Sequence, residues 1–228
     1  MAEKRFDVRL LAKGFLALLV VMAVLLALAG RVDYWQLWLF GGINVCFLAA
    51  VAIVFSGSAD LFRERFRAGS EAKGWDRVLW IFFGPANLAI VITAGLDAGR
   101  FHWTSGYHPM VYVLGYLGYV CGGTLHLWSV RHNPFYTSTV SIREEDGQAV
   151  VDRGPYGWVR HPGYTGIILM VNGMAIALGS TWALVPSGGS TLLLILRTWL
   201  EDRALHQELS GYQAYASRVR HRLLPRVW

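Results

Sequence analysis

The sequence is poor in charge. Only 16% of its 228 residues are Asp, Glu, Lys or Arg, whereas 54% are hydrophobic. This balance is too apolar for a typical soluble domain of this length. Charged residues are missing from whole stretches of close to 20 residues, which is the helix length that crosses the hydrocarbon core of a bilayer. The sequence therefore predicts an integral membrane protein, built as one all-α bundle of helices.

Cysteine is almost absent as well. Cys46 and Cys121 lie far apart in apolar stretches, so neither a disulfide framework nor a CxxC metal clip is available. The histidines show no HExxH or similar metal-ligand spacing, and neither GxGxxG nor GxxxxGK[ST] occurs. We therefore assign no metal, no Rossmann site and no P-loop. The net charge of +6 comes from basic residues between the apolar runs, which argues against nucleic-acid binding.

Windows of high hydropathy predict where the chain crosses the membrane. A region at Tyr164–Leu200 is too long for one crossing and is interrupted by Gly179, Pro186 and Gly188. A tight helical hairpin is therefore expected there, which brings the count to about six transmembrane helices. The four earlier spans are expected at Gly14–Gly30, Tyr34–Phe55, Val78–Leu96 and Pro109–Val130.

The distribution of basic residues predicts the orientation of these spans in the membrane. All but two of the 21 Lys and Arg residues lie in the N-terminal tail, the second and fourth connections, or the C-terminal segment. The exceptions, Arg31 and Arg100, lie in the connections of the opposite side. Because Lys and Arg accumulate in cytoplasmic loops, both termini are expected in the cytoplasm, at a bacterial inner membrane or an ER-like membrane.

Polar chemistry concentrates after residue 130. The connection from Arg131 to Gly163 is more than 30 residues long, and loops of this length tend to be functional or disordered. It ends in the run RGPYGWVRHPGY at 153–164, whose Gly, Pro and aromatic residues indicate a fixed, irregular backbone that can meet a ligand.

Within this run, Pro162 holds φ near about −65° and keeps His161 out of helical geometry. A helix is then expected to begin around Gly163, with its free amides directed toward the loop. Such a helix end attracts a carboxylate, for example that of an amino-acid-like cofactor, and His161 and Tyr164 offer hydrogen bonds beside it. A plain helix cap at the membrane interface explains the same residues, and this alternative stays open.

Arg197 and Glu201 are four residues apart and share one face of the last apolar helix. An arginine at the membrane boundary is costly unless it is paired or faces a polar cavity. Two interpretations stay open. Arg197 makes a structural ion pair with Glu201 or Asp202, or it holds an anionic substrate beside a carboxylate that binds a cationic cofactor.

The run at 153–164 and the segment from Arg197 onward together resemble the isoprenylcysteine carboxyl methyltransferases and the related phospholipid methyltransferases. The resemblance covers residues 131–228, whereas residues 1–130 share only their membrane spans. It departs from the family pattern at Glu201-Asp202, often a Glu-Glu pair, and at Ser210-Gly211, usually Phe-Gly. The residues that carry it are Val150-Val151, Gly154-Pro155-Tyr156, Arg160 to Gly166, Arg197, Glu201-Asp202, Leu205, Gly211, Tyr212, Tyr215, Val219 and Leu224-Pro225.

This resemblance implies a four-span region at 1–130 on the substrate side and a methyltransferase core at 131–228. It implies S-adenosylmethionine as the cofactor, in a pocket where the His161 turn meets the acidic end of the final helix. Arg197 takes the catalytic role of holding the substrate. The implied cofactor contacts are Gln148, Ala149, Val150, Val151, Tyr156, His161, Pro162, Gly163, Tyr164 and Glu201.

The implied reaction is methyl transfer to the carboxylate of a lipid or prenylated small molecule or peptide, such as an isoprenylcysteine. A carboxylate is already ionised near neutral pH, so no general base is needed. An alternative is a phospholipid or lipid-amine N-methyltransferase with the same cofactor site. A more distant alternative is an NADPH-dependent membrane reductase, because membrane sterol reductases resemble the same core. A transporter is disfavoured, since the first spans carry little buried charge.

Overall fold

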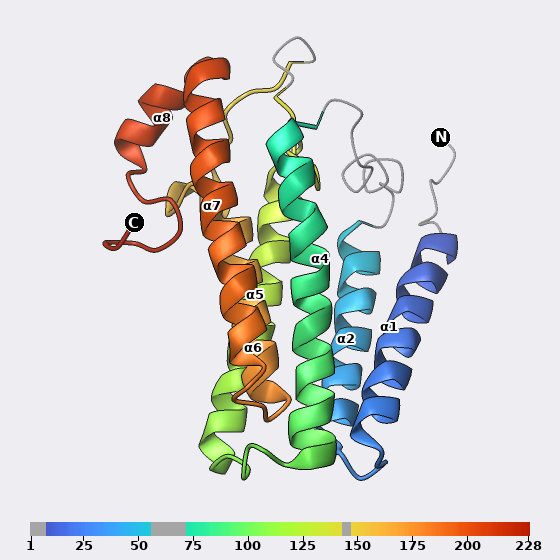
Figure 1. The fold of residues 1–228 in the computed structure, drawn as a ribbon. Coiled ribbons are helices and arrows are strands. Elements are labelled where there is room, and N and C mark those ends of the chain that lie inside the picture. Colours follow the sequence, from blue (N-terminus) through green and yellow to red (C-terminus); the bar gives the residue numbers. More distant parts are fainter. Residues whose placement is uncertain (1–7, 56–71, 143–146) are drawn as a thin grey trace.

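The computed structural model describes residues 8–55, 72–142 and 147–228 (Figure 1). Over these ranges the chain contains seven α-helices, a π-helical turn and a short 3₁₀ turn, with no strand. The long helices pack side by side into one bundle. Their bounds are α1 Val8–Ala29, α2 Trp35–Val54, α4 Gly74–Ala94, η1 Gly95–Phe101, α5 Pro109–His132, η3 Gly154–Gly157, α6 Pro162–Ala177, α7 Leu184–Glu208 and α8 Tyr212–Arg218.

Within the described ranges, four helical segments are long and apolar enough to cross a membrane, and they coincide with the four predicted spans. The third is longer than predicted because α4 continues directly into η1. The predicted fold class, an all-α bundle of membrane helices, is confirmed. The four segments are Leu11–Ala29, Trp35–Val54, Gly74–Phe101 and Pro109–His132.

The C-terminal hairpin is formed by α6 and α7, with its turn at residues 178–183 (Figure 1). Gly179 has a φ of +81° in this turn, a conformation that glycine adopts without strain. Pro186, expected to interrupt the helix, lies in the first turn of α7, where its missing N–H removes no hydrogen bond. Gly188 and Gly189 are also helical. The chain therefore breaks only at the turn around Gly179, and the breaks expected at the later residues are wrong.

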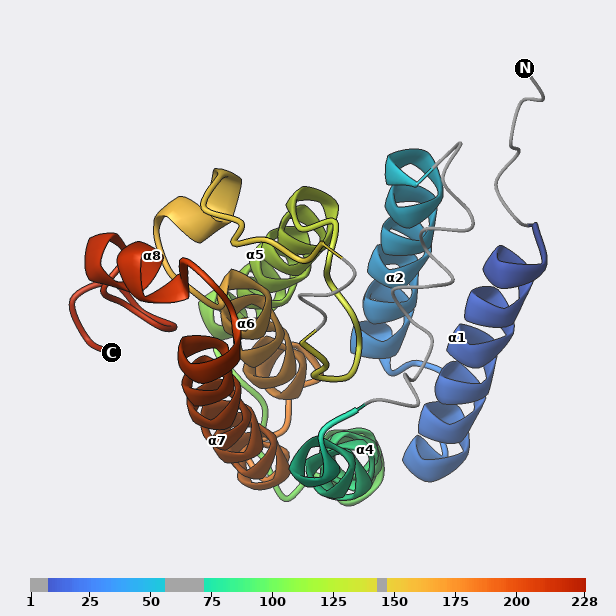
Figure 2. The ribbon, with the colours of Figure 1, turned by 90° about the horizontal axis from the view of Figure 1, so that it is seen from above.

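The helix ends that the predicted topology places on one side of the membrane lie together at one end of the bundle. The start of α1, the end of α2, the start of α4, the end of α5 and the end of α7 all lie at the upper end in Figure 1. Viewed from that end, α4 lies at one edge of the bundle, between α7 on one side and α1 on the other (Figure 2). Residues 56–71, which carry part of the basic charge used for orientation, lie outside the described ranges. The side of the membrane that this end faces stays a prediction.

Helices α5 and α6 approach each other through glycine. A Cβ atom added at Gly122 of α5 would lie 2.5 Å from the carbonyl oxygen of Gly166 on α6. One added at Gly173 of α6 would lie 2.5 Å from the backbone nitrogen of Tyr119. Small residues permit such backbone contact between membrane helices. The contact fixes the beginning of α6 against the end of α5, and so places the loop that joins them.

The opposite end of the bundle is tied together by a buried carboxylate. Asp97 in η1 is fully buried, and its Oδ1 accepts the backbone N–H of Thr104 at 2.6 Å. Its Oδ2 accepts the hydroxyls of Thr104 at 2.7 Å and of Ser180 at 2.6 Å. Since Ser180 belongs to the α6–α7 turn, Asp97 joins that turn to the connection between α4 and α5.

We expect the substitution Asp97→Ala to lower the free energy of unfolding by about 2–3 kcal/mol, because buried donors lose their acceptor. The measurement is thermal or denaturant unfolding of the purified protein in detergent. Asp33→Ala is the control, since Asp33 pairs with Arg31 but its side chain is 76% exposed, and exposed pairs contribute about 0–1 kcal/mol. Equal losses in the two variants would contradict the structural role of Asp97.

Candidate active site

The site is built on the beginning of α6. His161 is the N-cap residue, with φ −125° and ψ 58°, and Pro162 is the first helical residue, a position where its missing N–H removes no helical bond. The backbone N–H of Tyr164 donates to the carbonyl of His161 at 3.1 Å. The helix start expected around Gly163 is therefore found one residue earlier.

The C-terminal tail passes over this turn and is hydrogen-bonded to it. The N–H of Arg160 donates to the carbonyl of His221 at 2.9 Å. The N–H of His161 donates to the carbonyl of Arg222, also at 2.9 Å. The turn thus has its polar backbone groups satisfied by a segment about 60 positions later.

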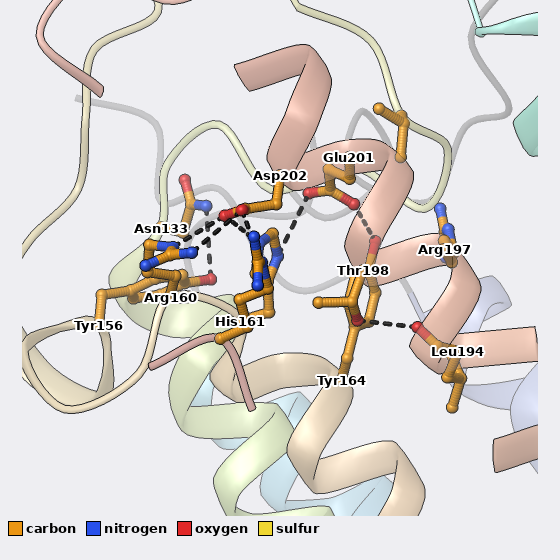
Figure 3. Close-up of polar contacts among 12 residues, drawn as sticks. Asn133, Tyr156, Arg160, His161, Tyr164, Leu194, Arg197, Thr198, Glu201 and Asp202 are labelled. Atoms are coloured by element: carbon orange, nitrogen blue, oxygen red, sulfur yellow. Dashed lines mark hydrogen bonds and ion pairs between the residues drawn. The ribbon is translucent and has the colours of Figure 1, made fainter. Parts of the chain in front are cut away.

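Asp202 on α7 is the acceptor at which the turn and the tail meet (Figure 3). Its Oδ1 accepts Nε of Arg160 and the hydroxyl of Tyr212, each at 2.8 Å. Its Oδ2 accepts Nε of Arg222 at 2.7 Å, and Nε2 of His161 lies 3.4 Å from Oδ1. Burial alone raises the pKa of this carboxyl, but hydrogen bonds from His161, Arg160 and Arg222 together hold it well below its usual range. Asp202 is therefore an ionised structural anchor.

A cavity of about 110 Å³ opens beside these residues, between the connection after α5, the beginning of α6, the end of α7 and α8. The His161 turn and the acidic end of α7 converge on it, as the sequence predicted. Nine of the ten predicted cofactor contacts line it, whereas Pro162 does not. That they bind a cofactor stays a prediction. The nine are Gln148, Ala149, Val150, Val151, Tyr156, His161, Gly163, Tyr164 and Glu201.

Sequence reasoning missed a further wall of the cavity, which residues 135–137 and 139–142 form. One buried polar atom there stands out. Within the described part of the chain, Oγ of Ser141 is the buried side-chain polar atom without a hydrogen-bond partner. A lone serine in a loop carries no sequence signal that could have identified it. Tyr212 and Tyr215 of α8 also line the cavity. Both belonged to the motif resemblance, but no contact was assigned to them.

Glu201 is the acidic residue that lines the cavity. The hydroxyl of Tyr164 donates to its Oε2, and Nδ1 of His161 lies 3.9 Å from its Oε1. The rings of His161 and Tyr164 are stacked, with centroids 5.7 Å apart. The Glu201 side chain is 21% exposed. Among the described residues, no Lys or Arg lies within ion-pair distance of Glu201, whose partners are the Tyr164 hydroxyl and the His161 ring.

Arg197 is paired with a residue that sequence reasoning did not consider. Its Nε donates to Oδ1 of Asp76 on α4 at 2.7 Å. Of the two interpretations left open, the ion pair of Arg197 with Glu201 or Asp202 is therefore wrong. Although Arg197 and Glu201 share a helix face, Glu201 turns toward the Tyr164 hydroxyl, whereas the Arg197 side chain lies apart from both acidic residues (Figure 3). Arg197 does not line the cavity. Its guanidinium carbon lies 5.1 Å from the ring centroids of both Trp80 and Tyr164, so it contacts the cavity through Tyr164.

Comparison with known proteins bears on the same region. Residues 110–210 match the sequence model of the phospholipid methyltransferase family. The lamin-B receptor of Drosophila melanogaster is 31% identical over 100 residues, which is 42% of this chain and 14% of that protein. The chain thus spans only a small part of this relative. The family match runs from α5 to the end of α7 and includes the His161 turn and Glu201. The comparison thus shows a likeness between this segment and the phospholipid methyltransferases.

Proposed function

We propose that this chain is an integral membrane methyltransferase that uses S-adenosylmethionine and methylates a lipid. The convergence on one cavity of nine predicted cofactor contacts, drawn from the loop before α6, the beginning of α6 and the end of α7, is the observation that carries the proposal. If the termini are cytoplasmic, as the basic residues predict, the cavity opens to the aqueous pool of the cofactor. The acceptor reaches it from the membrane.

The residues around the cavity fit this cofactor. Glu201 has no Lys or Arg partner among the described residues, and its carboxylate attracts the cationic amino group or sulfonium. Gly163 is the second residue of α6, so its backbone N–H precedes the first helical hydrogen bonds and favours a carboxylate. Tyr136 and Tyr156 offer ring faces for the adenine. The unpartnered Oγ of Ser141 is a further polar contact. When bound, S-adenosylmethionine supplies an electrophilic methyl carbon on a positively charged sulfur.

The tyrosines of the cavity serve as neutral hydrogen-bonding groups. Burial raises the pKa of Tyr136 to about 12, and burial also raises the pKa of Tyr156 well above its ordinary value. Both therefore stay protonated near neutral pH and can donate to a ligand. This leaves His161 and Glu201 as the side chains of the cavity that are able to accept a proton.

For an acceptor carboxylate, such as that of an isoprenylcysteine, the chain needs only to align the nucleophile and exclude water. We propose that Arg197 contacts this carboxylate. Its Nε and Nη2 are engaged by Asp76 and by the carbonyl of Ser138. Nη1 is the guanidinium nitrogen without a partner among the described residues. The contact is therefore made through one nitrogen, and the bidentate grip typical of free arginine is not available.

N-methylation of a lipid amine is a second candidate, and two observations favour it. The family match is to phospholipid methyltransferases, and Asp76 already neutralises Arg197, which weakens its attraction for a second carboxylate. An amine must lose a proton before it attacks, and Glu201 is the carboxylate placed to receive it. Incubation with lipid extracts and labelled cofactor separates the candidates, since methyl esters are cleaved by mild base and methylamines are not.

We expect Glu201→Gln to weaken binding of S-adenosylmethionine by about 10- to 100-fold, because a charge-assisted contact is lost. Isothermal titration calorimetry on the purified protein in detergent measures the effect. Glu208→Gln is the matched control, since Glu208 lies on the same helix but pairs with Lys73 at the surface. Unchanged affinity in Glu201→Gln, or no binding to the wild type, would overturn the assignment of the cavity.

A further inference from the structure

Asp76 occupies a position that the proposed reaction does not yet explain. It lies in the first turn of α4 and is fully buried. Its Oδ1 accepts Nε of Arg197 at 2.7 Å. Its Oδ2 accepts Nη2 of Arg197 at 3.3 Å and the backbone N–H of Val140 at 2.8 Å. Both carboxylate oxygens are thus used, one by the arginine and the other by the arginine and the loop together.

The loop segment that Asp76 holds is a wall of the cavity. Nη2 of Arg197 also donates to the carbonyl of Ser138 at 2.8 Å. The backbone N–H of Lys73 donates to the carbonyl of Val140 at 3.0 Å. Residues 138–140 are therefore fixed between the beginning of α4 and α7, and Thr139 and Val140 line the cavity. If Asp76 is removed, Val140 loses one of its two hydrogen bonds to the beginning of α4, and Arg197 loses the carboxylate that orients it beside Ser138.

Asp76 also determines which part of Arg197 remains available. With Nε and Nη2 engaged, the guanidinium is held in one orientation between the rings of Trp80 and Tyr164. Tyr164 in turn donates to Glu201 inside the cavity. A buried ion pair is weak evidence for stability, since packed apolar residues often serve as well. Its position behind Tyr164 indicates a role in aligning the site.

We propose that Asp76 is a positioning residue for methyl transfer, which acts through Arg197 by aiming its Nη1 group at the acceptor. The inference rests on the proposed function and deepens it, because it assigns a role to α4, outside the region that matches the methyltransferase family. Asp76 itself touches neither the cavity nor the acceptor. Its loss affects the acceptor step more than cofactor affinity.

A double-mutant cycle tests this role. The variants are Asp76→Asn, Arg197→Met and the two combined, assayed for methyl transfer to lipid extract with labelled S-adenosylmethionine. We expect Asp76→Asn to lower kcat/KM for the acceptor on the order of 30-fold, since small misplacements of a positioning group are costly. In the Arg197→Met background the same change is expected to cost less than about 3-fold. Cofactor affinity, measured by calorimetry, is expected to change less than about 5-fold.

Two further variants complete the experiment. Glu208→Gln breaks the neighbouring exposed pair between α4 and α7, from Lys73 to Glu208, and is expected to keep wild-type turnover. Asp76→Glu keeps the charge but displaces it by one methylene group, and remains informative if Asp76→Asn does not fold. It is expected to bind cofactor normally and to lose roughly 10-fold in acceptor kcat/KM.

The possible failures are distinguishable. If the losses in acceptor kcat/KM of the two single variants multiply in the double variant, the positioning role is overturned while the proposed function stands. The same holds if Asp76→Glu turns over at the wild-type level. Wild-type protein that binds cofactor but methylates no lipid would overturn both. A fall in cofactor affinity as large as the fall in acceptor kcat/KM would make Asp76 a structural support of the cavity wall only, and would also overturn the inference.

Discussion

Replacement of Asp202 by asparagine is expected to lower the free energy of unfolding by about 3–5 kcal/mol, the range for breaking one side of a buried ion pair. The Arg160 and Asp202 side chains are only 5% and 2% exposed, so the variant leaves a buried guanidinium without its counter-ion. An asparagine has one oxygen in place of two, and its amide group adds donors where Arg160, Arg222 and Tyr212 already donate.

The loss is expected to spread to the cavity. Arg160 also donates to the carbonyls of Val219 and Arg220 at 2.9 Å each, so the tail and α8 depend on the orientation that Asp202 gives it. Asp202→Asn should therefore abolish detectable binding of S-adenosylmethionine as well as lower the unfolding temperature. Asp152→Asn is the control, since the Asp152 to Arg218 pair joins the same loop and tail but is exposed and contributes about 0–1 kcal/mol.

The stability difference between this variant and the wild type is expected to depend on pH. The folded-state pKa of Asp202 lies below its ordinary value of 3.8, so ionised Asp202 stabilises the fold fully above that value. Its contribution is lost as pH falls further toward the folded-state pKa. The difference in unfolding temperature between wild type and Asp202→Asn should be constant near neutral pH and should narrow below about pH 4. A difference that is unchanged at pH 3, or an Asp202→Asn variant as stable as Asp152→Asn, would contradict the anchoring role.

The features that the sequence predicted well are those with a local signal. Uncharged runs identify four spans because each helix must satisfy its own backbone inside the membrane. The run at 153–164 identified the irregular loop because Gly, Pro and aromatic residues constrain the backbone locally. The His161 turn and Glu201 were placed at one site through their resemblance to a family motif, and the structure brings them together at one cavity.

The features that the sequence missed are long-range pairings. Asp76 and Arg197 are 121 positions apart, and no periodicity relates the first turn of one helix to the last turns of another. Glu201 and Asp202 were considered as partners of Arg197 because they are near it in sequence. Adjacent helical residues point about 100° apart, however, and Asp202 instead meets Arg160. The turn around Gly179 was one of several candidate breaks. The sequence alone does not distinguish a proline in the first turn of a helix from a proline that ends a helix.

A valine at Gly122 is expected to separate α5 from α6, with a loss of more than about 3 kcal/mol in the free energy of unfolding. The atoms in the way belong to backbone, the carbonyl oxygen of Gly166 at 2.5 Å and the amide nitrogen of Met170 at 2.7 Å, so no rotamer change relieves the contact. The loop at 133–161 leaves the end of α5 and returns at the start of α6. Any shift between these helices therefore moves His161 relative to the cavity wall.

Gly188→Val on α7 is the matched control, because a Cβ at Gly188 meets nothing within 4 Å. It is expected to leave stability unchanged or to raise it by less than about 1 kcal/mol, since glycine is the poorer helix former. Unfolding in detergent and calorimetric binding of S-adenosylmethionine measure both variants. We expect Gly122→Val to lose stability and binding together, because one helix contact determines both. A stable Gly122→Val protein that binds like Gly188→Val would show that the site does not depend on the close approach of α5 and α6.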